Sequence, residues 1–132
     1  MSSNDSRKPV HTAKVHDVIK DDSLLKVDGE KATAVLVDRV WPRGIAKDDL
    51  PYDEWFKDVA PTPDLRKWWN HREEDFDEFS QRYRDELNDN ESDELEQLQK
   101  LAENGPVVLL FAAKDREVNH AVVLAEWLNE NI

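Results

Sequence analysis

Side chains that could bind anions or transfer protons fall in two short stretches of this 132-residue chain. The first contains Asp38, Arg39, Trp41 and Arg43, and the second runs over residues 114–120. An arginine can hold two oxygens of a phosphate, sulfate or carboxylate at once. A histidine close to a carboxylate can take up or release a proton near neutral pH. The two stretches together therefore predict an anion-binding site with acid–base capacity.

Each stretch follows an apolar run that is typical of a buried strand, over residues 34–38 and residues 107–113. Several helices are predicted between the two runs, which favours a parallel pair because the chain must cross back over the sheet. The carboxyl ends of parallel strands meet at one edge, and ligands of open α/β sheets bind at that edge. We therefore expect the two polar stretches to face each other.

This arrangement assigns roles to individual residues. Asp38 and His120 are the candidate proton-transfer pair. Pro42 and Gly44 interrupt regular structure, so they should fix the loop that carries the arginines. The start of the last helix should add backbone donors for an anion. The predicted ligand contacts are Arg39, Trp41, Arg43, Lys114, Arg116 and Asn119.

The same residues also have purely structural interpretations. Asp38 and Arg39 could be members of ion pairs, and His120 could bond a backbone carbonyl. Trp41, like the other tryptophans, could pack in or at the rim of the core.

The remaining elements predict an α/β fold with a small, mainly parallel sheet of about three strands and helices packed on its faces. Residues 13–18 alternate like an edge strand, and residues 53–59 suggest a short helix. Thr62-Pro63 is a start signal for a helix, and Gly105-Pro106 is a stop signal after another. We expect residues 1–10 to be a disordered tail and residues 11–132 to form a single domain.

Five segments of the sequence are distinctive: Val37-Asp38-Arg39-Val40-Trp41-Pro42-Arg43-Gly44, Trp55-Phe56-Lys57-Asp58-Val59-Ala60-Pro61, Leu65-Arg66-Lys67-Trp68, Leu109-Leu110-Phe111-Ala112-Ala113-Lys114-Asp115 and Asn119-His120-Ala121. Together they resemble one bacterial family, the uncharacterised YeaO-like proteins called domain of unknown function 488. The resemblance covers roughly residues 12 to 130. It implies a small α/β domain and no settled activity. Phe111 stands where these proteins usually have tyrosine, which argues against a mechanism that needs a phenol there.

The formal charge of −12 is concentrated in one region. Residues 73–104 hold 13 acidic and 3 basic residues, whereas residues 38–47 hold one acid and three bases. An acidic surface repels a phosphate backbone, which argues against nucleic acid as a partner. There is no cysteine, no signal peptide and no apolar run long enough for a membrane helix, so we expect a cytoplasmic protein.

Motifs for cofactors are absent from the sequence. The four histidines are scattered, and the three glycines form no phosphate-binding loop. We therefore expect neither a metal site nor a nucleotide cofactor. Two hypotheses remain. The first is an enzyme that performs acid–base chemistry on an anionic small molecule. The second is a non-catalytic binding or regulatory protein that docks a protein partner through the Trp41 and Arg43 loop.

Overall fold

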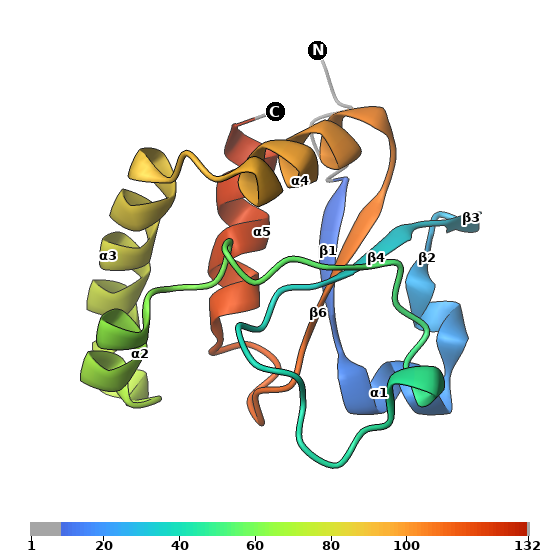
Figure 1. Ribbon diagram of the computed structural model, residues 1–132, viewed down its shortest axis with the longest axis horizontal. Helices are drawn as coiled ribbons and strands as arrows, with labels where there is room; N and C mark the ends of the chain where they lie inside the picture. The colour runs from blue at the N-terminus through green and yellow to red at the C-terminus, as the bar shows by residue number, and fades with distance from the viewer. Residues whose placement is uncertain (1–8, 132) are drawn as a thin grey trace.

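The computed structural model describes residues 9–131, which are built around a four-stranded sheet (Figure 1). The strand order is β1-β6-β4-β5, and each neighbouring pair is parallel. The strands are β1 (Val10–Lys14), β2 (Lys26–Val27), β3 (Glu30–Lys31), β4 (Thr33–Leu36), β5 (Glu54–Trp55) and β6 (Val107–Phe111), of which β2 and β3 form a separate hairpin. The helices are α1 (Val15–Lys20), α2 (Pro63–Trp69), α3 (Phe76–Asp89), α4 (Asp93–Asn104) and α5 (His120–Glu130).

Strand β6 is one of the two inner strands of the sheet and lies between β1 and β4. All five of its residues are buried, as its unbroken apolar run predicts. It pairs with β1 from Val10↔Val107 to Lys14↔Phe111, and with β4 from Thr33↔Val107 to Leu36↔Leu110. The predicted parallel pair of strands is confirmed. The carboxyl ends of β4 and β6 therefore lie side by side.

Helices cover the two faces of the sheet unequally (Figure 1). Val35 and Val37 point to one face, where α2, α3, α4 and α5 supply a large apolar cluster. Ala34 and Leu36 point to the other face, which packs against α1, Leu50 and the loop before β5. This alternation follows from the two-residue period of a strand. The predicted fold class, a parallel sheet with helices on its faces, is confirmed.

The sheet has one strand more than the three expected, and that strand replaces a predicted helix. Residues 53–59 suggested a short helix, but Glu54 and Trp55 pair with Val35 and Leu36 as β5. The Asp53 carboxylate accepts a hydrogen bond from the Ala34 amide, and the Asp53 amide donates to the Ala34 carbonyl. The free edge of β4 needs partners for its backbone groups, and that need overrides a weak local preference for helix.

The first strand also lies earlier than expected. Residues 13–18 were predicted as an edge strand, whereas β1 ends at Lys14 and α1 begins at Val15. Val15 and Val18 are both buried, and their spacing of three suits one face of a helix. Strand β1 is at the edge of the sheet, as expected.

The predicted helix ends agree with the structure. Thr62 caps α2 by accepting a hydrogen bond from the Leu65 amide, with Pro63 at the first helical position. Helix α4 ends at Asn104, directly before Gly105-Pro106. Of the predicted tail over residues 1–10, residues 1–8 lie outside the described residues, and Val10 belongs to β1. Within residues 9–131, no helix is long and apolar enough to span a membrane.

Candidate functional site

A cavity of about 620 Å³ opens where the carboxyl ends of β4 and β6 meet. Its volume falls within the range of roughly 300–1,000 Å³ that is usual for small-molecule sites. The end of the sheet, the loop over residues 57–62 and helix α2 enclose it. The residues that line it are Asp38, Arg39, Val40, Ala60, Pro61, Pro63, Asp64, Arg66, Lys67, Trp69, Asn70, His71, Phe79, Ala112, Ala113 and His120.

The topology of the sheet explains why a cavity forms at this point. After β4 the chain moves to the face that carries Leu50 and continues to β5. After β6 it moves to the opposite face and enters α5, which packs against β1. The two connections diverge to opposite faces and opposite sides of the sheet, which leaves a crevice between the strand ends. Such switch points are where open α/β sheets bind ligands.

Asp38 and His120 meet at the base of this cavity. Asp38 Oδ1 lies 3.3 Å from His120 Nε2, and each of the two side chains is 15% exposed. Asp38 Oδ2 accepts a 3.0 Å hydrogen bond from the Ala112 amide, which ties the end of β4 to the end of β6. The two polar stretches that the sequence places on one edge of the sheet are therefore in contact.

The surroundings of His120 determine which ring nitrogen carries its proton. His120 Nε2 lies 3.1 Å from the Val37 carbonyl oxygen. A carbonyl can only accept a hydrogen bond, so in the neutral ring the proton is on Nε2. The single N–H is thereby shared between the Val37 carbonyl and Asp38. Asp38 Oδ1 is buried and, among the described residues, has no hydrogen-bond partner of good geometry.

Arg39 extends from β4 to the loop that forms one wall of the cavity. Its Nη2 donates to the carbonyls of Ala60 and Pro61 at 3.1 and 3.4 Å. Its Nη1 lies 4.0 Å from Asp58 Oδ1, a distance that gives only a weak, solvent-screened ion pair. The side chain is 28% exposed, while its Nε is buried without a partner among the described residues. Arg39 therefore holds the loop in place through hydrogen bonds and also contributes a positive charge to the cavity.

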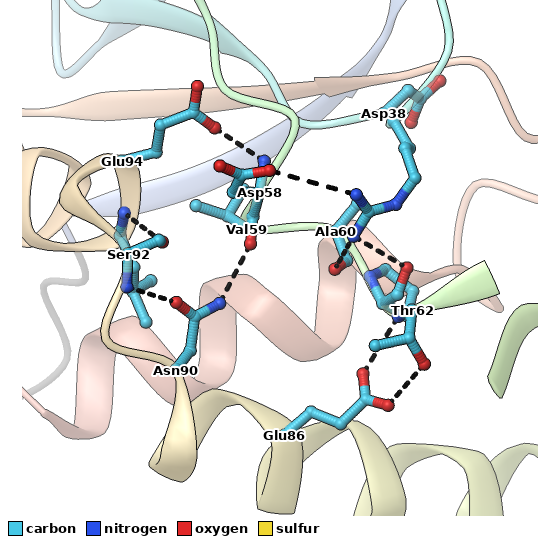
Figure 2. A network of polar contacts seen from close by, with 12 residues as sticks. Asp38, Asp58, Val59, Ala60, Thr62, Glu86, Asn90, Ser92 and Glu94 are labelled. Atoms are coloured by element: carbon cyan, nitrogen blue, oxygen red, sulfur yellow. Dashed lines mark hydrogen bonds and ion pairs between the residues drawn. The ribbon is translucent and has the colours of Figure 1, made fainter. Parts of the chain in front are cut away.

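The wall itself is held by side chains from α3, α4 and the turn between them (Figure 2). Glu86 accepts hydrogen bonds from the Thr62 amide and hydroxyl, and Glu94 accepts one from the Asp58 amide. Asn90 donates to the Asp58 carbonyl. Tyr83 donates to the Val59 carbonyl at 2.6 Å, and burial raises its pKa well above the ordinary value. These bonds fix the wall to the helical layer.

Helix α2 brings basic residues to the cavity that the sequence analysis did not select. Arg66 and Lys67 line the cavity and are exposed, and no carboxylate of the described residues pairs with either side chain within 4.0 Å. His71 follows at φ 58°, a left-handed conformation that few non-glycine residues adopt. Its ring lies 5.1 Å from that of Trp69. In the sequence, Arg66 and Lys67 look like ordinary solvated helix charges, and only the position of α2 shows otherwise.

Two predicted ligand contacts lie away from the cavity. Trp41 packs edge-to-face against Tyr52 and Trp55, with ring centroids 5.3 Å apart in both pairs, and its indole nitrogen donates to the Ile45 carbonyl. Arg43 is exposed on the same loop and does not line the cavity.

Three other predicted contacts have local partners outside the cavity. Arg116 makes a two-pronged ion pair with Asp17 at 2.7 Å, and this contact lowers the pKa of Asp17 and raises that of Arg116. Asn119 is 1% exposed and caps α5 by accepting from the Val122 amide. Lys114 is exposed, and its carbonyl accepts from the Lys14 ammonium group. Asp38, Arg39 and His120 are thus the predicted residues that meet at the cavity.

Over residues 9–131 there is no group of three or more histidine, aspartate or glutamate side chains that could hold a metal. Charged and polar side chains from the strand ends and from α2 line the cavity together with apolar ones. The fold and the cavity together define a small α/β protein with a candidate ligand site at a topological switch point.

Comparison with known proteins places the chain in a family. A family model described as "Inactive DUF488-N3 subclade" matches residues 11–132. The uncharacterized protein Rv3073c of Mycobacterium tuberculosis is 45% identical over 103 residues, covering 78% of this chain and 86% of the relative. The uncharacterized protein YeaO of Escherichia coli is 45% identical over 94 residues, covering 71% and 81%. No solved structure matches the chain. This protein belongs to the DUF488 family of YeaO-like proteins.

Proposed function

We propose that this protein binds a small anionic molecule in the cavity at the carboxyl edge of its sheet. The observation that carries the proposal is the excess of cations around the cavity of a strongly acidic protein. Arg39, Arg66 and Lys67 line it against the two carboxylates of Asp38 and Asp64, while the whole chain has a formal charge of −12. Cations held close together in an acidic protein repel one another less when an anion lies between them.

Arg66 and Lys67 are the residues best suited to hold the anionic group. They have no ion-pair partner within the described part of the chain, so an incoming anion displaces no carboxylate. Arg39 has a smaller share, because its Nη2 already donates to two carbonyls of the wall. The apolar side chains of Val40 and Pro63 line the same space, are exposed and offer packing surface for the body of the ligand.

Binding without turnover is the form of the proposal that two observations support. The matching family model is described as an inactive subclade. His120 Nε2–H also donates a hydrogen bond to the Val37 carbonyl. The ring therefore has a structural role in addition to its place in the cavity. We therefore propose a binding or regulatory role in which occupation of the cavity, and not a product, is the output.

A thermal-shift screen tests this proposal at low salt. The panel contains sulfate, phosphate, nucleotides, sugar phosphates and dicarboxylates. A ligand at about 100 times its Kd should stabilise the fold by nearly 3 kcal/mol. We expect the Arg66→Ala/Lys67→Ala double variant to lose this stabilisation, while the matched variant Arg43→Ala keeps it. An unchanged melting temperature with every compound, or an equal loss in both variants, would contradict the proposal.

Acid–base catalysis on the same ligand is a second candidate, because Asp38 and His120 form a carboxylate–imidazole pair at the base of the cavity. It predicts chemical change in a compound that the screen selects. Prolonged incubation with the protein followed by mass spectrometry measures such change. Product that forms with the natural protein and not with His120→Gln would establish turnover, and an unaltered ligand would leave binding as the function.

Docking of a protein partner through the Trp41 and Arg43 loop has less support. The Trp41 ring packs against Tyr52 and Trp55 and its N–H is already bonded, so little of this side chain is left for a partner. Val40 is the exposed apolar side chain nearby, at 68% exposure. A single exposed apolar residue is normal for a protein surface.

A further inference from the structure

In the Asp38–His120 pair, a single N–H faces two hydrogen-bond acceptors. His120 Nε2–H faces both the Val37 carbonyl at 3.1 Å and Asp38 Oδ1 at 3.3 Å. Asp38 has one full hydrogen bond to protein, from the Ala112 amide to Oδ2, and its buried Oδ1 has none of good geometry among the described residues. The Asp38 side chain is 15% exposed, so its carboxylate is stabilised in part by the water that still reaches it.

A ligand in the cavity changes this balance. It removes the water that reaches Asp38 and His120, and water is what stabilises an incompletely bonded carboxylate. An anionic ligand also adds a second negative charge within the same low-dielectric space. The second negative charge favours a positive charge on the imidazole, which lines the cavity beside Asp38. The loss of water strengthens the attraction between that positive charge and the Asp38 carboxylate, because the local dielectric falls. Protonating the ring on Nδ1 places that charge there without disturbing the Nε2 bond to Val37.

We infer that anion binding in this cavity is coupled to the uptake of one proton by His120. The inference rests on the proposed function and adds regulation by pH to it. His120 then acts as a binding residue whose charge appears when the ligand does. By linkage, the ligand binds more tightly as the pH falls, and the bound ligand raises the affinity of His120 for its proton.

The groups that surround His120 indicate that it is the residue that takes up the proton. From β4 it is faced by the Asp38 carboxylate, and from α3 by the Tyr83 ring with centroids 6.4 Å apart. The Tyr83 hydroxyl is bonded to Val59, and burial raises its pKa, so it stays neutral in the relevant range. The other charged groups of the cavity lining are Arg39, which follows β4, and Asp64, Arg66 and Lys67 on α2. His71 at the rim is the second imidazole of the cavity and needs its own control.

Isothermal titration calorimetry with sulfate tests the coupling. Sulfate keeps its double charge throughout the range in which imidazoles titrate, about pH 5 to 8, so that any proton taken up enters the protein. We expect the Kd of sulfate to rise about tenfold between about pH 6 and about pH 8. Buffers of different ionisation enthalpy at intermediate pH should report an uptake approaching one proton for each sulfate bound.

Two matched variants assign the proton. Glutamine keeps an N–H donor and has no titratable group, so we expect His120→Gln to bind sulfate with little dependence on pH. His71→Gln should retain the full dependence. Independently of any variant, NMR of the natural protein at constant pH should show the ring nitrogens of His120 moving towards imidazolium shifts when sulfate is added, whether or not His120→Gln folds.

The possible failures are distinguishable. Sulfate binding that is independent of pH, or a dependence that disappears in His71→Gln, overturns the coupling and leaves the proposed anion site intact. Absence of sulfate binding at both pH values overturns the coupling as well. The proposed function fails separately, when no compound of the thermal-shift panel stabilises the protein.

Discussion

The segment of residues 37–44 divides between two regions of the molecule that differ in how completely their polar groups are satisfied. Its first half supplies Asp38 and Arg39 to the cavity, where one oxygen and one nitrogen are buried without good partners among the described residues. Its second half supplies Trp41 to an aromatic cluster with Tyr52 and Trp55 on the opposite face. There the Trp41 N–H is bonded at 2.6 Å.

Within residues 9–131, only the first of these regions has buried polar groups that a ligand could still satisfy. A region whose polar groups are bonded and whose rings are packed gains little from a further molecule. A region with unpaired cations and an incompletely bonded carboxylate gains hydrogen bonds and charge neutralisation when a ligand enters. Two residues of a single short motif can thus have separate tasks, Arg39 in the site and Trp41 in the fold.

The largest expected effect comes from removing the aromatic cluster. Trp41→Ala deletes contacts with two rings and a hydrogen bond, and should lower the free energy of unfolding by about 3 kcal/mol. Urea denaturation measures this loss. Because Trp41 itself does not line the cavity, ligand binding should persist in the folded variant. Loss of ligand binding in a variant that is still folded would show that the aromatic cluster takes part in the binding site.

A smaller loss of stability is expected when Arg39, which is bonded to the loop over residues 57–62, is removed. Arg39→Ala leaves the carbonyls of Ala60 and Pro61 without their donor and should cost about 2 kcal/mol. Hydrogen exchange should become faster at the amides of Asp58, Val59, Ala60 and Thr62 and stay unchanged in β6. Uniform acceleration over the whole sheet would instead mean that Arg39 stabilises the fold globally.

Tyr83 tests the same wall from the helical layer. Tyr83→Phe removes the bond to the Val59 carbonyl and should cost about 1 kcal/mol at neutral pH. Burial raises the pKa of Tyr83, so above about pH 10 the unfolded chain releases this proton while the folded chain retains it. The stability of the natural protein should therefore fall more steeply with rising pH than that of the variant. Parallel curves for the two proteins in urea titrations above this pH would contradict the assignment.

The smallest effect is expected at Arg43. This side chain is exposed, lies outside the cavity and makes no ion pair with the residues described, so Arg43→Ala should change stability by less than about 0.5 kcal/mol. Ligand-induced stabilisation should also be unchanged, which makes the variant a control for Arg66 and Lys67. A clear loss of ligand binding in Arg43→Ala would return the loop to the site.

The sheet and its carboxyl edge could be predicted because they depend on local patterns. The apolar runs that became β4 and β6 mark strands buried on both faces, and parallel pairing then brings Asp38 and His120 to one edge. These inferences use only strand geometry and chain order.

The rest of the site depends on contacts between distant segments. Arg66 and Lys67 reach the cavity because α2 lies beside the end of the sheet, and nothing in the sequence around them specifies that position. Trp41 and Arg43 lie on a loop that crosses to the other face of the sheet. There Trp41 packs against Tyr52 and Trp55. The short strand β5 forms because the edge of β4 needs a partner, against a local pattern that favoured helix.

The most direct test of the central claim is an NMR titration of the natural protein with the compound that stabilises it most in the thermal-shift screen. Backbone amide shifts show where the ligand lies. We predict the largest changes at Ala60, Asn70, Ala112 and Ala113, which line the cavity, and negligible changes at Gly44 and Lys47. Changes concentrated at Gly44, Lys47 and Tyr52 would place the ligand on the aromatic loop and contradict the account.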